Sequence, residues 1–315
     1  MNFPINSRVL LAWQQRCQPL SGAHYKAVSC RMWRMSLHYD LHSHSIASDG
    51  TLSPVELVTA AHDAGVDVLA LTDHDTLDGL LDAARTARAL GVQLVPGVEI
   101  SVSWQSQTIH VLGLGVDPGN ETLQAGLAGL REFRHWRAEE IGRRLARAGI
   151  GGCYTGARAL AKGNIVGRTH FAQYLVAAGH ARSVREVFKR FLVNNKPGFV
   201  PGQWTSLEAA LEWIHTAGGL AVVAHPARYH MTSSKLRRLI AEFRAGGGAG
   251  LEVVSGSHSR DNITAMASLC RNENMLASCG SDYHGPQNPW IKLGQLPALP
   301  AGCQPVWESD RWPLQ

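Results

Sequence analysis

The sequence lacks a long hydrophobic run. No apolar stretch approaches the roughly 20 residues that a membrane-spanning helix needs. Near the N-terminus, Arg8 is followed by only five apolar residues before a polar segment begins. That stretch is too short for the core of a secretory signal peptide. We therefore expect a cytoplasmic protein without a membrane partner, in which residues 1–34 form a disordered extension and Met35 is a second candidate start.

Paired cysteines are absent as well. None of the six cysteines belongs to a C-x-x-C motif, and their scatter fits neither a disulfide framework nor a thiolate zinc site. We expect reduced thiols, as is usual in the cytoplasm. Charged residues are also sparse, at 17% against 45% hydrophobic residues, which excludes a disordered or coiled-coil chain and indicates a globular one.

Length and net charge do not by themselves decide the number of domains or the kind of partner. A chain of 315 residues suits about two domains, or one large barrel with an insertion. The formal net charge of +5 indicates an anionic partner without identifying it. No internal repeat and no motif specific for DNA stands out.

Short apolar runs alternate with helical patterns along most of the chain. Ser53, Pro54 and Glu56 form an N-terminal capping pattern for a helix that ends at Gly65. Further helices are predicted from Thr76 to Gly91 and from Ser206 to the glycines at 218–219. This alternation favours an α/β fold with a parallel sheet, and about seven strands favour an irregular (β/α) barrel. The predicted strands are 37–42, 66–72, 92–101, 109–116, 219–225, 250–255 and 276–281.

One segment, residues 118–205, breaks the alternation with mostly helical patterns and no clear strand. It holds 14 Lys and Arg against five Glu and no Asp, a net charge of +9, so the rest of the chain sums to −4. We predict a basic helical insertion, a lid, between a first barrel part at 35–117 and a second at 206–315.

Histidines and carboxylates gather where the predicted strands end. His42 and His44 share one face of the first strand, because side chains alternate along a strand. Active sites of (β/α) barrels form at the carboxyl ends of the strands, so nine side chains from six strands are predicted to converge. They are His42, His44, Asp49, His74, Glu99, His110, His225, Asp282 and His284.

Nine nitrogen and oxygen donors without a thiolate suit two or three Mn, Fe or Zn ions. Glu99 is a candidate bridge, since a carboxylate has two oxygens to share. Singly, each residue has a simpler explanation: a histidine at a strand end is usually just hydrogen-bonded, Asp282 could cap a helix, and Asp73 and Asp75 could cap the helix at Thr76. Repetition at six strand ends favours the metal interpretation.

These motifs, in this order, resemble those of the polymerase and histidinol phosphatase (PHP) superfamily over about residues 37–310. The resemblance implies a distorted (β/α)7 barrel and a phosphoesterase site with two or three metals, for which we favour Mn over Fe, Zn or Mg. It implies three ligand sets, which are His42, His44, Glu99 and Asp282; Glu99, His110 and His225; and Asp49, His74 and His284.

Within the insertion, residues 130–137 and 167–171 are similar to the lid of a PHP subgroup that acts on nucleoside 3′,5′-bisphosphates such as pAp and on RNA. The implied function is removal of the 3′-phosphate from such nucleotides, 5′-to-3′ exoribonuclease cleavage of 5′-phosphorylated RNA, or both, with a role in trimming ribosomal RNA precursors. We hypothesise that Arg134 and Arg168 grip the substrate 5′-phosphate, because guanidinium groups match phosphate oxygens. Alternatively, Arg131, Arg134 and Arg137 form a solvated helix stripe.

For the aromatic side chains of the lid, core packing is a simpler role than base stacking; the candidates are Trp136, Phe171 and Tyr174.

As mechanism we expect a metal-bound hydroxide to attack phosphorus in line, with no side-chain nucleophile. Three alternatives stay open: another PHP phosphatase, such as one for histidinol phosphate; a metal-dependent amidohydrolase, which would normally have a bridging Lys; and a non-catalytic RNA-binding protein with structural metals.

Overall fold

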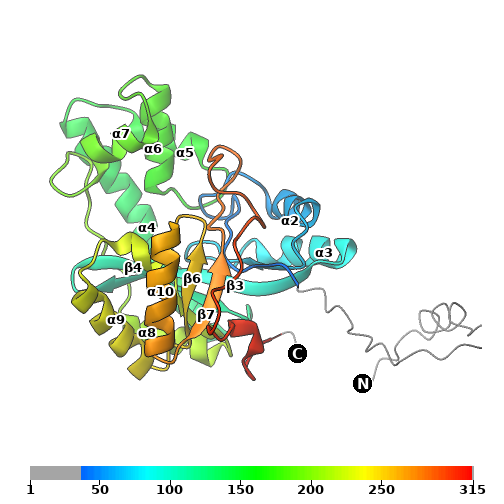
Figure 1. The fold of residues 1–315 in the computed structure, drawn as a ribbon. Helices are drawn as coiled ribbons and strands as arrows, with labels where there is room; N and C mark the ends of the chain where they lie inside the picture. The colour runs from blue at the N-terminus through cyan, green and yellow to red at the C-terminus, as the bar shows by residue number, and fades with distance from the viewer. Residues whose placement is uncertain (1–36, 314–315) are drawn as a thin grey trace, which may run out of the picture. The chain divides into compact units, whose positions relative to one another are not determined.

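The computed structural model describes residues 37–313, so the expected extension at 1–34 lies outside the described residues. Seven strands form one sheet in the order of the sequence, which confirms the α/β barrel expectation (Figure 1). The last strand meets the first, since the Leu41 amide donates to the Cys279 carbonyl at 3.0 Å and the Asp282 amide to the His42 carbonyl at 2.9 Å. The strands are β1 (Tyr39–Asp40), β2 (Val68–Leu71), β3 (Gln93–Trp104), β4 (Gln107–Leu114), β5 (Leu220–Val223), β6 (Gly250–Ser255) and β7 (Leu276–Gly280).

The expectation of a parallel sheet is wrong for β4, which runs antiparallel to both β3 and β5. A two-residue turn joins β3 to β4, with Gln105 at φ 44° and Ser106 at φ 62°. Two consecutive left-handed residues are the geometry of the tight hairpin turn that matches strand twist. The reversal has a consequence for the site, because it brings the start of β4, where His110 lies, to the carboxyl ends of the parallel strands.

Helices cover the outside of the sheet. The capping pattern predicted at Ser53 is present, with the Ser53 hydroxyl accepting from the Glu56 amide and Glu56 accepting from the Ser53 amide. The helix predicted from Thr76 instead begins at Leu80, and it ends as expected at a left-handed Gly91. The covering helices are α2 (Pro54–Asp63), α3 (Leu80–Leu90), α8 (Leu207–Thr216), α9 (Ser233–Ala245) and α10 (Arg260–Asn272), with 3₁₀ turns at Pro226–Tyr229 and Val306–Glu308.

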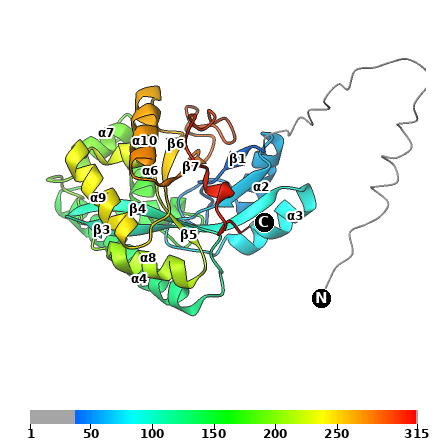
Figure 2. The ribbon, with the colours of Figure 1, turned by 60° about the horizontal axis from the view of Figure 1, so that its bottom comes forward.

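Residues 118–205 contain helices and no strand, as expected from their pattern. These are α4 (Glu121–Arg147), α5 (Cys153–Leu160), α6 (Arg168–Ala177) and α7 (Val184–Val187), followed by a π-helical turn at Phe188–Leu192. Figure 1 shows α5, α6 and α7 gathered at one end of the barrel, and Figure 2 shows α8 beside α4.

Helix α4 belongs to two hydrophobic cores. Its first half, including Leu123 and Leu127, packs in the core between the sheet and the helices. Its second half, including Ile141 and Leu145, packs in a separate core around Phe171. The lid is therefore a small packed unit of its own, anchored on the barrel by a continuous helix of 27 residues.

No helix between residues 37 and 313 is long and apolar enough to cross a bilayer. The four cysteines in that range are free thiols, and Cys17 and Cys30 lie outside it.

Candidate metal centre

Four of the predicted ligands meet in one buried cluster. His42 and His44 follow β1, Glu99 lies on β3, and Asp282 follows β7. The Nε2 atoms of His42 and His44 lie 3.1 Å apart. Glu99 Oε2 lies 3.3 Å from the first of these nitrogens and 3.2 Å from the second, and Asp282 Oδ1 lies at 3.5 and 3.3 Å.

These spacings fit a shared cation. In a tetrahedral site with metal–ligand bonds of about 2.0–2.1 Å, neighbouring donor atoms are about 3.3 Å apart. Glu99 Oε2 supports the same conclusion, because imidazole nitrogens surround it and yet it accepts no hydrogen bond. The four donor atoms therefore converge on a common point.

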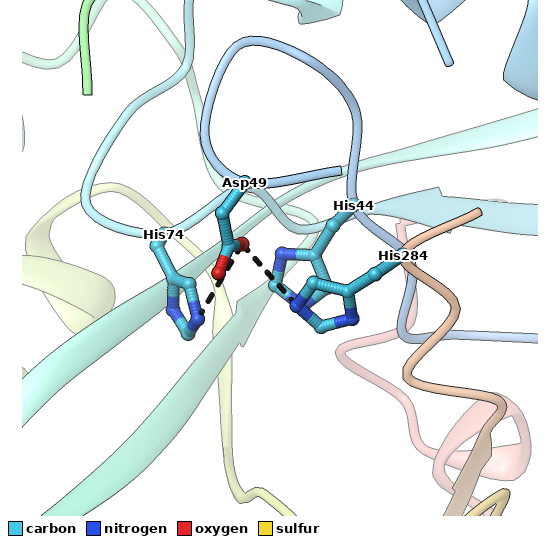
Figure 3. Close-up of side chains that lie close together, drawn as sticks. All are labelled: His44, Asp49, His74 and His284. Atoms are coloured by element: carbon cyan, nitrogen blue, oxygen red, sulfur yellow. Dashed lines mark ion pairs between the residues drawn. The ribbon is translucent and has the colours of Figure 1, made fainter. Parts of the chain in front are cut away.

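A second group lies beside the first (Figure 3). Asp49, in the loop after β1, faces His284 at 3.2 Å and His74 at 3.9 Å, measured from its Oδ1 to the Nε2 atoms. His44 stacks on His284 with ring centroids 4.1 Å apart, so it belongs to both groups. This group contains the three residues expected for one ion and adds His44.

Glu99 occupies the centre of the whole arrangement. Its Oε1 lies 2.8 Å from His110 Nδ1 and 3.0 Å from His225 Nε2, while its Oε2 lies 3.0 Å from His74 Nδ1. The side chain is fully buried. The third compact donor group is His74, Glu99 and His110, whereas the expected set had His225 in place of His74.

The backbone is held in unfavourable conformations at two of these residues. His225 has φ 30° and Asp282 has φ 57°, in the left-handed region that residues other than glycine rarely adopt. Such conformations cost about 1–3 kcal/mol each and persist where the surroundings impose them. At His225 the constraint is visible, because its amide donates to the buried Glu252 carboxylate at 2.6 Å.

The electrostatics of the cluster are strongly coupled. Burial opposes charge on Glu99, but His74, His110 and His42 hold its pKa well below the usual range. Asp282 and Asp49 behave likewise, since neighbouring histidines outweigh burial and lower the pKa of each carboxyl well below normal. Burial lowers the pKa of His74 to about 4, more than Glu99 and Asp49 raise it.

The residues present fit divalent metal ions. Several buried nitrogen and oxygen atoms that could bind a metal have no hydrogen-bond partner. Among them are His44 Nδ1, Asp49 Oδ1, His74 Nδ1 and His225 Nδ1. A donor set of six imidazoles and three ionised carboxylates without thiolate is typical of borderline and hard first-row divalent ions. All nine predicted residues lie in this one assembly, and their individual roles as ligands stay predictions.

Sequence reasoning missed the acids that support the cluster. Glu252 accepts from His42 Nδ1 at 3.1 Å and so orients that ring. Asp73 accepts from the Ser45 amide at 2.8 Å and from the Ser48 hydroxyl at 2.6 Å, so the suggestion that it caps a helix is wrong. An acidic residue inside an otherwise apolar strand, as Glu252 is in β6, is the signal that could have identified this role.

Arginines from the lid line the same cavity, which has a volume of about 630 Å³. Arg134 donates to Asp75 at 2.6 Å and to the Ser101 hydroxyl at 2.8 Å, so Asp75 is also no helix cap. The Arg168 side chain makes no hydrogen bond or ion pair with residues 37–313, and its guanidinium lies 5.5 Å from the centre of the Phe188 ring. Burial, with Arg168 and Arg134 nearby, lowers the pKa of Arg137 to about 9. Three guanidinium groups therefore share one region of the cavity, where Arg134 is paired with Asp75 and Asp49 lies in the same lining.

The lid also contacts the metal centre directly. Thr169 Oγ1 donates to Asp49 Oδ2 at 3.3 Å, so the lid segment 167–171 lies against a candidate ligand. The solvated-stripe alternative is wrong, because Arg131, Arg134 and Arg137 are all partly buried and hydrogen-bonded.

The aromatic side chains of the lid differ in how deeply they are buried. Phe171 is fully buried in the lid core and Tyr174 packs against that core, whereas Trp136 is 47% exposed. The aromatic residues that line the cavity are Phe188, Phe199 and Trp204, all of which the sequence interpretation missed. The guanidinium groups of Arg134 and Arg137 lie 4.9 and 5.4 Å from the centre of the Trp204 ring.

Comparison with known proteins adds independent information. Residues 40–192 match the PHP domain. A 3′,5′-nucleoside bisphosphate phosphatase of Chromobacterium violaceum is 46% identical over 271 residues, 86% of this chain and 95% of the relative. The 5′-3′ exoribonuclease of Haemophilus influenzae is 43% identical over 275 residues, 87% of this chain and 100% of the relative. The 5′-3′ exoribonuclease Rnm of Escherichia coli is 44% identical, covering 86% of this chain and 92% of the relative.

Solved structures agree on the fold. A structure of an amidohydrolase from Chromobacterium violaceum, with bound sulfate and no metal, has a TM-score of 0.83 at 45% identity and covers 86% of this chain and 94% of that one. A Bifidobacterium adolescentis structure named for a metal-dependent phosphoesterase has a TM-score of 0.74 at 28% identity, covering 82% of this chain and 92% of that one.

Proposed function

This chain belongs to the PHP domain family, and from that premise we propose that it is a metal-dependent phosphoesterase for 5′-phosphorylated nucleotides and RNA. It removes the 3′-phosphate of nucleoside 3′,5′-bisphosphates and cleaves 5′-phosphorylated RNA from its 5′ end. One observation carries the proposal: a single cavity joins a cluster of metal-ligand side chains to a cluster of arginines.

The two activities need the same arrangement. In each substrate, the bond that breaks joins phosphorus to the 3′-oxygen of a nucleotide that carries a 5′-phosphate. Water supplies the oxygen that bonds to phosphorus, and the 3′-oxygen leaves and gains a proton. An enzyme that holds the 5′-phosphate at one end of a cavity positions the 3′-phosphorus at the other end, whether or not a chain continues from it.

Arg168 and Arg134 hold the 5′-phosphate in this proposal. Arg168 is the stronger candidate, since its guanidinium has no hydrogen-bond partner within the described residues and an anion would supply one. Arg134 is fixed in place by Asp75 and Ser101, so little side-chain entropy remains to be lost when a ligand binds. Arg137 adds positive charge behind them.

At the other end of the cavity, the nine predicted ligands hold two or three divalent ions, for which we propose Mn. When bound, such ions lower the pKa of water and stabilise negative charge on phosphoryl oxygens. Glu99 is the bridging ligand in this proposal because imidazoles approach both of its oxygens. Arg228 donates to Asp282 at 2.5 Å and lines the cavity, where it adds a positive charge close to the reacting phosphate.

The amidohydrolase alternative finds no support in the lining of the cavity. No lysine is among the described residues that line it, and a carboxylate, Glu99, stands at the central position. Arginines in the wall favour a substrate with more than one phosphate over a simple phosphomonoester such as histidinol phosphate. We further propose that the protein acts in the cytoplasm, where trimming of ribosomal RNA precursors would provide its substrates.

The direct test is hydrolysis of pAp by purified protein loaded with Mn²⁺, with phosphate release and bound metal measured together. We expect phosphate and AMP from pAp, 5′-mononucleotides from a 5′-phosphorylated oligoribonucleotide, and little release from histidinol phosphate. His42→Ala should lower turnover by orders of magnitude, whereas His62→Ala, at an exposed histidine of α2, should not.

Loaded protein that hydrolyses neither pAp nor the oligonucleotide would refute the proposal. Preference for histidinol phosphate would favour another PHP phosphatase. An Asp282→Ala protein that retained RNA binding and every cellular effect would favour the non-catalytic alternative.

A further inference from the structure

A second hollow lies in the loops that follow β6 and β7. It has a volume of about 220 Å³, and its lining includes His258, Arg260, Trp290 and Lys292. Trp290 is 88% exposed, which is unusual for the largest hydrophobic side chain. None of these four residues lines the cavity of the metal centre.

The charge of this hollow has one sign. Its lining contains an arginine, a lysine and a histidine and no carboxylate. Arg260 and Lys292 are both exposed, and neither forms an ion pair within residues 37–313. His258 Nε2 is buried without a hydrogen-bond partner. An exposed aromatic ring among unpaired cations is the composition with which proteins bind single-stranded nucleic acid without sequence preference.

The hollow borders the loop that carries two of the candidate metal ligands. Trp290 lies in the same loop after β7 that carries Asp282 and His284, and Figure 1 shows this loop rising at the lid end of the barrel. The other wall is tied to it, because the Gly256 amide donates to the Gly280 carbonyl at 3.1 Å. A side chain at Gly256 would lie 2.2 Å from the Ser281 carbonyl oxygen, so only glycine permits this close approach.

We propose that this hollow is a track for single-stranded RNA on the 3′ side of the bond that is cleaved. The inference rests on the proposed function and extends it. An RNA substrate continues from the reacting phosphorus, whereas pAp ends there, so only RNA needs a path away from the metal centre. A base stacks on Trp290, and Arg260 and Lys292 contact the phosphates that follow.

Binding of 3′-labelled, 5′-phosphorylated oligo(A) to EDTA-treated full-length protein tests the proposal without depending on turnover. Fluorescence anisotropy compares a 10-mer with a 2-mer. The wild type should bind the 10-mer more tightly, and Trp290→Ala should reduce this advantage by about tenfold, the value of one stacked base. Trp290→Phe should restore most of it. In Arg260→Gln/Lys292→Gln, the salt dependence of 10-mer binding should fall by about 1.4 in log–log slope, for two lost contacts.

The matched control for charge is Arg85→Gln/Arg88→Gln, which removes two exposed cations from α3. It should leave the advantage of the 10-mer unchanged. Equal binding of both oligonucleotides by the wild type would overturn the track, as would a Trp290→Ala protein that keeps the full advantage. Failure of the proposed function is a separate result, namely Mn-loaded wild type that hydrolyses neither pAp nor RNA.

Discussion

The barrel mouth and the lid are built in opposite ways. The mouth gathers buried acids and imidazoles from strand ends that are far apart in the sequence, and three of its carboxyls have pKa values far below normal. The lid is one continuous segment with a net charge of +9, and its arginines enter the cavity from helices. The rigid sheet suits groups that must meet within a fraction of an ångström, whereas the helical unit supplies the positive charge that, in our proposal, binds the substrate.

The comparison separates chemistry from specificity. Changes at the mouth should abolish turnover on every substrate, because all of them present the same bond to the same ligands. Changes in the lid should alter which substrates are preferred. Thr169, which donates to Asp49, is one contact between the two regions, and the ion pair of Arg134 with Asp75 is another.

The largest effect is expected for Glu99→Gln. The amide has no charge and only one acceptor oxygen, so it cannot replace a carboxylate that faces imidazoles on both sides. We expect kcat/KM for pAp to fall on the order of 10³-fold, with loss of bound metal. Phosphate release and elemental analysis measure the two effects. Glu212→Gln, at an exposed position of α8, is the control.

A free-energy change of similar size should show that the two regions unfold independently. Phe171 is fully buried in the lid core, so Phe171→Ala should cost about 3–5 kcal/mol there. Hydrogen exchange should show faster opening of α5 and α6 while barrel amides keep their protection. Equal loss of protection in β5 and β6 would contradict the view that the lid has its own core.

Specificity should change with Arg168→Ala. Losing a charged hydrogen bond to the 5′-phosphate costs about 1.5–3 kcal/mol, which is roughly 10- to 100-fold in kcat/KM. The loss should appear with pAp and be nearly absent with adenosine 3′-phosphate, which lacks the 5′-phosphate. Arg182→Ala, at an exposed lid position, should affect neither substrate. An equal loss on both substrates would mean that Arg168 supports the metal centre instead.

The fold class and the set of residues that meet at the barrel mouth could be predicted from the sequence, because strand periodicity and repeated histidines at strand ends are local patterns. The direction of β4 could not be predicted, since the turn at Gln105 and Ser106 is left-handed without a glycine to signal it. The hairpin depends on pairing between β3 and β4, which no local pattern specifies.

The supporting residues were also beyond local patterns. Asp75 follows Asp73 by only two residues, but Asp75 binds a lid arginine and Asp73 binds serines of the loop after β1. Nothing in the local sequence distinguishes Trp204 from Trp136. Trp204 lines the cavity, where its indole N–H donates to Thr108, a residue far away in the sequence. Tertiary packing decides such roles.

The smallest effect is expected for Asp75→Asn, which tests whether Arg134 needs its partner on the barrel. Asparagine tolerates the left-handed backbone of Asp75, at φ 54°, so the change removes charge with little strain. Arg134 would lose an ion pair that now fixes it at 2.6 Å, and the KM for pAp should rise roughly three- to tenfold. The kcat should stay nearly constant, because the ligands of the metal centre are untouched. A fall in kcat without a change in KM would show that Asp75 serves the chemistry of the mouth, and the division between the two regions would then be drawn in the wrong place.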